Sequence, residues 1–350
     1  MIEELNEKLT ASKIEIIDVR IAAQWDAYVA RHSDATCFHL YGWRQALETT
    51  LGYETRYFGA IQDGTLVGIL PVAFVSSRLF GTSLVSLPFC TYGGAVSDDL
   101  NITTQLKDAA MEFAKSKGAG FFESRVVGSA SSPVQEHTYF TFRKAIPAGT
   151  AEMTFMPSKR RNMVRKAISA GLSWDVSRDL NKFFHLYAEN ARAHGTPALP
   201  KQFFACLLES LGNAVDILFV YDKGGRPISC IMSFFDKGIV HAGFAGEIQV
   251  ARELAANDFK YWSLYQFAKN RDCTVFDLGR SKINTGSYDF KKLWGLEPSP
   301  ITHEVHLIAM KEKPKNNPNN PKFALAIKVW AKLPRFVVDR LGPSIIHGLG

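Results

Sequence analysis

The sequence predicts a two-domain protein of the α/β (α+β) class. At 350 residues the chain is long for one hydrophobic core and comfortable for two domains of about 150 residues each. Each half also shows the same order of expected elements: two helices, a β-hairpin, a strand, a helix and a last strand. A repeated order of this kind indicates an internal duplication, although the two halves share no obvious sequence identity.

The first half contains a strong hairpin signal and a clear helix end. Gln62-Asp63-Gly64 separates two segments that alternate between apolar and polar residues, as in a hairpin. Apolar residues then recur at helical spacing as far as Gly118, which is suited to ending a helix because glycine accepts a positive φ. We expect helices over 22–32, from Tyr41 onward and over 101–117, and strands over 57–61, 66–75 and 120–127.

The second half repeats this order behind a linker-like segment. Ile146-Pro-Ala-Gly-Thr150 places the domain boundary near residues 145–156, which gives domains 1–150 and 151–310. Asp222-Lys-Gly-Gly225 is the expected hairpin turn. We expect helices over 157–170, 180–193 and 255–269, and strands over 217–221, 228–235, 240–245 and 274–278.

Composition excludes several classes of protein. The hydrophobic content of 46% and charged content of 21% are those of an ordinary globular chain. No apolar run approaches the roughly 20 residues that span a bilayer, and the acidic N-terminus lacks the features of a signal peptide, so we expect a cytoplasmic protein. The five cysteines are widely spaced without a C-x-x-C pair, and the nine histidines are scattered. We therefore expect neither a disulfide framework nor a metal site.

Most of the net charge lies in the C-terminal tail. Eight basic and two acidic residues between 311 and 350 give this segment +6 of the chain's +7. Residues 311–321 are a polar linker broken by proline, and 322–350 form a basic amphipathic tail. One hypothesis is that 322–340 bind an anionic inner-membrane surface, which would make the protein peripheral to that membrane. The other is that the helix packs back onto the second domain.

The segment from Phe276 to Gly295 carries the densest set of candidate site residues. An apolar strand runs into a loop of Gly, Arg, Ser, Asn and Thr, and then into Tyr288, Phe290, Lys291 and Trp294. Loops at strand ends are common places for functional sites. The plainer interpretation is a connector in which the lysines are solvated and Trp294 fills the core.

The pattern Arg280-Ser281 followed by Gly286-x-Tyr288-x-Phe290-Lys291-x-x-Trp294-Gly295 resembles the closing signature of FemAB-like transferases. The resemblance extends to 156–172, to Ala193-His194-Gly195-Thr196 and to 252–279. The tail at 333–343 is similar to FemAB-related proteins of the exosortase (PEP-CTERM) system. The resemblance implies two tandem GNAT-like domains (the acyl-CoA N-acyltransferase fold) with a basic helical tail.

The resemblance also implies a reaction. FemAB-like enzymes append amino acids from aminoacyl-tRNA to a cell-wall precursor, so we expect an aminoacyl or acyl transferase that acts on an amine or hydroxyl of a cell-surface glycan or peptidoglycan-type precursor, in exopolysaccharide biosynthesis. We expect no tightly bound cofactor, aminoacyl-tRNA or acyl-CoA as co-substrate, and a glycan or lipid-linked precursor as partner. The alternatives are an acyl-CoA-dependent sugar N-acetyltransferase and a non-catalytic protein that binds a nucleotide-sugar or a membrane assembly.

The expected catalytic residues lie in the closing signature. The resemblance assigns oxyanion stabilisation to Lys291 with help from the backbone of Phe290, and Tyr288 lines the same pocket. Arginines of the basic run 159–166 are candidates for binding phosphate, because a guanidinium grips phosphate bidentately; a solvated basic face is the alternative. The expected substrate-binding residues are Arg280, Arg161, Arg165, Tyr92, Gly93, Trp294 and His194.

Two motifs depart from the related enzymes. Lys115-Ser-Lys-Gly118-Ala-Gly120 imitates the R/Q-x-x-G-x-G/A loop that binds the pyrophosphate of acetyl-CoA, but it follows a helix and precedes a strand, which is the wrong order. Leu199-Pro200-Lys-Gln-Phe203 lacks the Arg and Tyr that cell-wall enzymes carry around this proline. We therefore expect an acceptor other than the usual nucleotide-linked muropeptide.

Overall fold

The computed structural model describes residues 13–77, 81–127, 138–149, 152–311 and 321–348. The chain forms two compact units. Unit 1 comprises residues 1–126, 303–314 and 348–350, and unit 2 comprises 127–302 and 315–347. The division lies near residue 127 rather than 150, because the strand β6 (Tyr139–Ala145) pairs with strands of unit 2.

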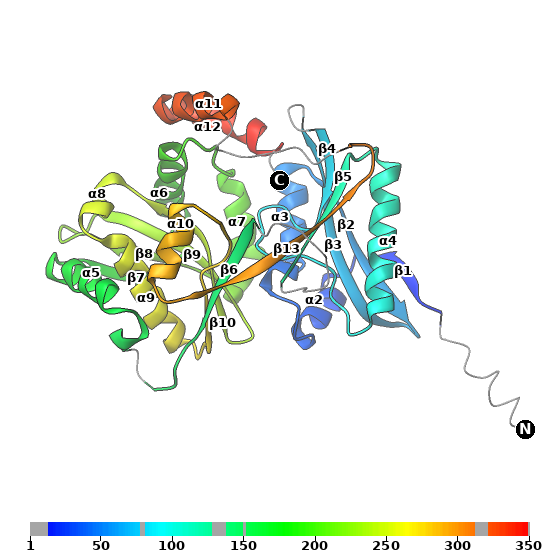
Figure 1. Ribbon diagram of the computed structural model, residues 1–350, viewed down its shortest axis with the longest axis horizontal. Coiled ribbons are helices and arrows are strands. Elements are labelled where there is room, and N and C mark those ends of the chain that lie inside the picture. Colours follow the sequence, from blue (N-terminus) through cyan, green and yellow to red (C-terminus); the bar gives the residue numbers. More distant parts are fainter. Residues whose placement is uncertain (1–12, 78–80, 128–137, 150–151, 312–320, 349–350) are drawn as a thin grey trace, which may run out of the picture. The chain divides into compact units, whose positions relative to one another are not determined.

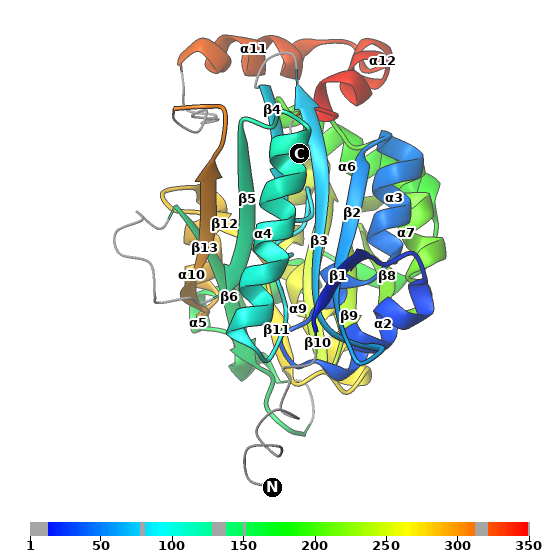
Figure 2. The same cartoon turned by 90° about the vertical axis from the view of Figure 1, so that its right-hand side faces the viewer.

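Unit 1 contains a sheet in the order β1-β2-β3-β4-β5. The last two strands are parallel, and the earlier neighbours are antiparallel. Leu70, Leu84 and Phe122 of the sheet form a buried cluster with Leu106 and Ala110 of α4, which covers one face (Figure 2). The elements are β1 (Glu15–Asp18), α2 (Ala22–Arg31), α3 (Gly42–Leu51), β2 (Glu54–Gln62), β3 (Thr65–Ser77), β4 (Gly81–Val85), α4 (Leu100–Ser116) and β5 (Phe121–Val127).

Unit 2 repeats this plan with the sheet order β6-β11-β10-β9-β8-β7 (Figure 1). Again a parallel pair, β10 with β11, is joined through a long helix, α9. The elements are β6, α5 (Ser158–Ser169), β7 (Ser173–Val176), α6 (Leu180–Ala193), α7 (Lys201–Ser210), β8 (Val215–Tyr221), β9 (Pro227–Asp236), β10 (Ile239–Glu247), α8 (Gln249–Glu253), α9 (Ala256–Asn270), β11 (Val275–Asp277), β12 (Ser281–Lys282) and α10 (Gly286–Leu293).

The helix α9 is buried on almost every side. Phe259, Trp262, Leu264 and Tyr265 are all in the core of unit 2, with aromatic contacts such as Tyr265 stacked on Phe155 at 4.0 Å. Burial of each such side chain contributes about 1.5–3 kcal/mol. This helix therefore anchors the residues that it presents at its N-terminal end.

The long strand β13 (Glu297–Leu307) contributes to both units. Its first residues pair with β6, and residues 303–307 belong to unit 1. The sequence analysis did not predict β1, β4, β6, β7, α7, α8, β12 or β13. The strands and α8 are short or, in β13, interrupted by two prolines, so their apolar periodicity is weak. In α7 the periodicity is present, with Phe203, Phe204, Leu207 and Leu208 on the buried face, and the sequence analysis overlooked it.

The tail forms two helices, α11 (Pro321–Lys332) and α12 (Arg335–Ile346). Trp330 is buried, and the carbonyl of Ala331 accepts a hydrogen bond from Arg192 Nη1 of α6 at 3.0 Å. The tail thus packs on α6 of the same unit (Figure 1). Most of the expected linker, 312–320, and the side chain of Lys322 lie outside the described residues. No helix in the described part of the chain is long and apolar enough to cross a membrane.

Candidate functional site

The centre of unit 2 is the place where β10 and β11 diverge. The two strands pair only through residues 239–241 and 275–277, after which β11 ends and β10 continues to Glu247. The chain turns away at Gly279, whose φ is +67° and whose N–H donates to Asp277 Oδ1 at 2.7 Å. Glycine suits this position because a positive φ strains other residues.

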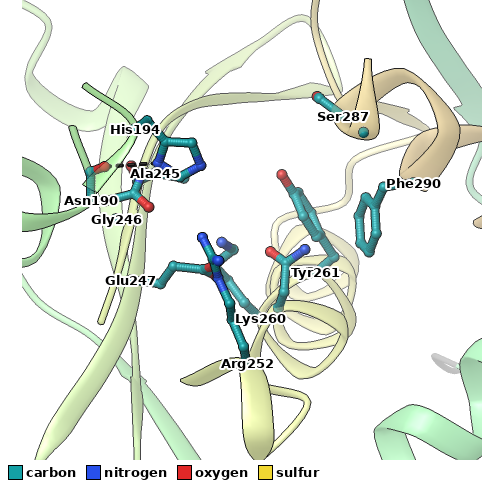
Figure 3. A pocket seen from close by; sticks show the side chains of 12 residues that line it. Asn190, His194, Ala245, Gly246, Glu247, Arg252, Lys260, Tyr261, Ser287 and Phe290 are labelled. Carbon is teal, nitrogen blue, oxygen red and sulfur yellow. Dashed lines mark hydrogen bonds and ion pairs between the residues drawn. The ribbon is translucent and has the colours of Figure 1, made fainter. Parts of the chain in front are cut away.

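An open pocket of about 470 Å³ lies beside the last part of β10, which still pairs with β9 but no longer with β11. Figure 3 shows His194 on one side, Glu247, Arg252 and Lys260 in the middle, and Tyr261 and Phe290 on the other side. The lining comes from α6, the end of β10, α8, α9 and the start of α10. The backbone of α6 comes so close to β10 that a Cβ on Gly246 would lie 2.5 Å from the carbonyl carbon of Leu186. Gly246 is therefore required to bring α6 to the pocket.

Lys291 lies behind the pocket and not in its lining. Its side chain is 5% exposed, and Nζ donates to the carbonyl oxygens of Gly279 at 2.9 Å and Arg280 at 3.1 Å. Burial lowers the pKa of this ammonium to about 7; Asp277 acts against this and Arg280 adds to it. The sequence analysis expected this ammonium to face the reacting carbonyl, whereas the structure directs it onto the turn that ends β11.

Asp277 organises the polar groups below this turn. Its carboxylate accepts hydrogen bonds from Arg143 Nε at 2.8 Å and Thr141 Oγ1 at 3.2 Å, and His241 Nδ1 lies 3.3 Å away. Burial acts to raise the pKa of Asp277, but His241 and Arg143 outweigh it and hold that pKa below its ordinary value. A buried carboxylate thus fixes the end of β11.

Trp294 and Phe290 attach α10 to α9. Trp294 is fully buried, and its Nε1 donates to Asp258 Oδ1 at 2.9 Å. The same carboxylate forms an ion pair with Arg160, whose Nη1 lies 3.4 Å from Asp258 Oδ2. Phe290 lines the pocket with its ring 5.4 Å from the ring of Tyr261. The burial of Trp294 fits the interpretation that this side chain fills the core. Phe290, in contrast, faces the pocket.

Two other residues of the signature lie on the β6 side of α10. The ring of Tyr288 packs against Phe140 and Phe142 at centroid distances of 5.5 and 5.2 Å. The Arg280 guanidinium lies over the ring of Tyr139 at 4.8 Å. Neither Tyr288 nor Arg280 lines the described pocket.

The remaining predicted residues are spread over both units. His194 follows α6 as its C-cap and lines the pocket, with Nδ1 2.8 Å from the carbonyl oxygen of Asn190. On α5, Arg165 is exposed and Arg161 is half-buried, and neither lines this pocket. Tyr92 of unit 1 is buried against Phe38, and a Cβ on Gly93 would lie 2.8 Å from the carbonyl oxygen of Ser86. Close packing within unit 1 is thus sufficient to account for an aromatic residue at position 92 and a glycine at position 93.

Sequence reasoning missed Lys260 and Glu247. Both line the pocket, and Lys260 is only 2% exposed. The available signal was a lysine among the apolar residues of an otherwise buried helix, which periodicity alone does not distinguish from a solvated residue. Among the described residues, no group of His, Cys, Asp and Glu is arranged to hold a metal ion.

The segment 115–120, which imitates the pyrophosphate loop in sequence, has the helix-to-strand order that the sequence analysis predicted. Gly118 follows α4 with φ +65° and precedes β5. In unit 2 the segment Arg252-Glu-Leu-Ala255-Ala-Asn257 runs from the end of the short helix α8, which follows β10, into the start of α9, with Ala255 at φ +57°. Ala255 and Asn257 stand where the R/Q-x-x-G-x-G/A motif has small residues, so the loop is a degenerate version of it.

Comparisons with known proteins agree with this architecture. Residues 158–292 match the model of an acetyltransferase (GNAT) domain. A crystal structure of FemX superimposes with a TM-score of 0.65 at 15% identity, over 84% of this chain and 98% of that one. A tandem GNAT protein from the clavulanic acid biosynthesis pathway gives 0.53 at 11% identity, over 84% and 98% of the two chains. The chain therefore has the tandem GNAT fold, and its residues 158–292 match an acetyltransferase (GNAT) domain.

A third structure shares the tandem GNAT fold. The C-terminal domain of a putative lysylphosphatidylglycerol synthetase from Agrobacterium fabrum gives a TM-score of 0.58 at 11% identity, over 82% of this chain and 92% of that one. At these identities each likeness shows the fold alone. No curated protein sequence matches the chain significantly.

Proposed function

We propose that the protein transfers an aminoacyl or acyl group from an activated ester or thioester to an amine or hydroxyl of a cell-surface glycan or peptidoglycan-type precursor. The divergence of β10 from β11 beside the pocket carries this proposal. An uncovered strand edge presents backbone N–H groups, which can hold a carbonyl oxygen and the oxyanion that develops from it. The resemblance of the tail to exosortase-system proteins supports a role in exopolysaccharide biosynthesis, and we propose that the reaction takes place on the cytoplasmic side.

The reaction needs a nucleophile held close to the acyl carbon. Attack by a neutral amine or a hydroxyl forms a tetrahedral intermediate, and its collapse releases the alcohol or thiol of the donor. In this scheme Lys291 positions the Gly279–Arg280 turn next to the β10 edge, and Phe290 and Tyr261 form an apolar wall against the acyl chain. Loss of one such preorganised group costs on the order of 2.7–4 kcal/mol of transition-state stabilisation.

Two donors fit the pocket. Arg252 gives its lining a permanent cation, which suits the phosphates of either aminoacyl-tRNA or acyl-CoA. FemX and the lysylphosphatidylglycerol synthetase share the fold and favour an aminoacyl donor by analogy. Arg161 and Arg165 on α5 would contact further phosphates of a long donor. We propose that the donor is a co-substrate and that no cofactor stays bound.

The second candidate is an acyl-CoA-dependent sugar N-acetyltransferase. The position of Arg252-Glu-Leu-Ala255-Ala-Asn257 at the N-terminal end of α9 favours it, because a helix N-terminus that follows a strand of the sheet suits a pyrophosphate, even though the short helix α8 comes first here. The convergence of Glu247, Arg252 and Lys260 on one pocket weighs against a purely non-catalytic binding protein.

Transfer of label distinguishes these functions. The native protein would be incubated with a glycan-lipid extract of the source cell and with either a mixed pool of charged tRNA or acetyl-CoA, the acyl group being labelled. Lys291→Met should reduce transfer from the true donor by about 10²–10³-fold. Lys292→Met is the matched control, because Lys292 lies next to it on α10 but is exposed.

The identity of the active donor decides between the candidates. Transfer only from charged tRNA supports the aminoacyl transferase, and transfer only from acetyl-CoA supports the sugar N-acetyltransferase. No transfer from either donor would reject both and leave the binding protein. Equal activity of Lys291→Met and Lys292→Met would show that Lys291 has no part in the transfer reaction.

A further inference from the structure

Lys260 is a buried lysine that faces an open pocket. It is the fifth residue of α9, is 2% exposed, and belongs to the pocket lining beside Glu247 and Arg252 (Figure 3). Within the described part of the chain, its Nζ makes no hydrogen bond or ion pair, and it lies 5.2 Å from the centre of the Tyr261 ring. A buried lysine without a partner is uncommon, because an unpaired ammonium is costly to bury.

The anionic groups around Lys260 are engaged with other partners. Glu247, at the end of β10, pairs with Arg252 Nε at 3.4 Å, and Asp258 of α9 binds Trp294 and Arg160. Cys230 on β9 is a neutral thiol, since burial raises its pKa to about 12. Burial lowers the pKa of Lys260, although Glu247, Cys230 and Asp258 act in the opposite direction. Tyr261, whose phenol has its pKa raised by burial, and His194, on the far side of the pocket, are the other titratable groups of the lining.

We propose that Lys260, as the neutral amine, accepts the proton that the acceptor nucleophile releases during acyl transfer. This inference rests on the proposed function and adds the proton acceptor that the reaction needs. The neutral amine of the acceptor attacks, and the C–N bond to the acyl carbon forms. The Lys260 amine takes one proton from the nitrogen of the tetrahedral intermediate, and the resulting Lys260 ammonium gives this proton to the leaving oxygen or sulfur as the C–O or C–S bond of the donor breaks.

The other titratable groups of unit 2 are less suited to this step. The Glu247 carboxylate is held by Arg252, and the ring of His194 is held at Asn190 on the pocket rim. Lys291 is enclosed behind the turn, with two backbone carbonyls on its Nζ. Lys260 lines the pocket, and its Nζ forms no hydrogen bond or ion pair with any residue that the structure describes. A base with these properties typically contributes about 10²–10⁴-fold to the rate.

The test compares kcat/KM across pH for the native protein, Lys260→Met and Lys260→Arg, with Lys269→Met on the same helix as the control. Lys260→Met removes the base, and Lys260→Arg keeps a permanent cation that cannot accept a proton. We expect both to lose about 10²–10⁴-fold and to lose the rise of kcat/KM with pH that the native protein shows. Lys269→Met should keep the native rate and profile.

Two further measurements separate the possible failures. Thermal unfolding of Lys260→Met checks the fold, which should persist because methionine has a similar length without the buried charge. The pH dependence of acetylation of Lys260 by acetic anhydride, read by mass spectrometry, reports its titration without any transfer assay. Native rates and an unchanged pH profile in Lys260→Met would overturn the inference while the proposed function stands. Absence of transfer by the native protein from either donor would overturn both.

Discussion

Lys291 Nζ lies 2.9 Å from the carbonyl oxygen of Gly279, at the turn where β11 ends and the chain departs from β10. The same ammonium also holds the carbonyl oxygen of Arg280. One side chain from α10 thus donates to two backbone carbonyls of the same turn. The turn at which the two strands diverge is therefore held by Lys291, which follows Gly279 by twelve positions.

The buried Lys291 should make stability depend on pH. Its pKa of about 7 in the folded protein lies below the value of about 10.4 for an unfolded lysine. Below pH 7 both states are protonated and the cost of burying the charge is fully present. Between these values only the unfolded state holds the proton, so stability rises with pH. Urea unfolding of the native protein should show this rise relative to Lys291→Met.

The control for this measurement is Lys292→Met, whose difference from the native protein should stay constant with pH because Lys292 is exposed. A constant difference for Lys291→Met as well would show that Lys291 binds its proton equally well in the folded and unfolded states.

Trp294→Phe should destabilise unit 2 by about 1–3 kcal/mol, because it leaves a buried oxygen of Asp258 without its indole donor. Burial already raises the pKa of Asp258 despite Arg160 and Trp294, so loss of the donor should raise this pKa further. Urea unfolding measures the effect. Trp174→Phe on β7 is the control, since Trp174 is only half-buried. An equal loss in both variants would contradict a specific part for the Trp294 hydrogen bond.

Asp277→Asn should cost roughly 3–5 kcal/mol, because it removes the charge that Arg143 and His241 share in the core. The lowered pKa of Asp277 means that its contribution is present above the ordinary aspartate range and is lost as pH falls below it. The native protein should therefore lose stability on acidification more steeply than Asp277→Asn. The exposed Asp289→Asn on α10 serves as the reference, and a cost as small as in that variant would refute the prediction.

Truncation at Lys313 should destabilise unit 2. The tail covers α6 with the buried Trp330 and Val338, and each such side chain contributes about 1.5–3 kcal/mol. A Cβ on Gly195 would lie 2.5 Å from the carbonyl oxygen of Ile327, so the contact is close. Thermal unfolding of the intact and truncated chains measures the loss. An unchanged melting temperature would mean that the tail does not pack in solution.

The same two chains test the membrane hypothesis. Because α11 uses Trp330 against the body of unit 2, we expect both chains to sediment equally with anionic vesicles. The exposed Val329 and Leu341, next to basic residues, are the side chains that a membrane would contact if this expectation fails. Binding by the intact chain alone, weakened by salt, would support the peripheral location.

Local patterns in the sequence determined much of this protein. The hairpins, the helices α4 and α9, the duplicated order and the importance of the segment that ends at Gly295 all follow from periodicity, turn residues and motif spacing, which act over a few neighbouring residues. The order of elements at Gly118 likewise sufficed to reject a phosphate loop there.

Only the tertiary structure decided which side chains meet. Lys291 and Lys260 each follow a phenylalanine in the sequence, yet one is directed onto the Gly279 turn and the other into the pocket. The pairing of β6 with β11, across more than a hundred residues, brings Arg143 to Asp277. Burial and charge pairing depend on such long-range contacts, which sequence periodicity does not encode, so the surroundings of each ionisable group emerge only when the sheet and helices have packed.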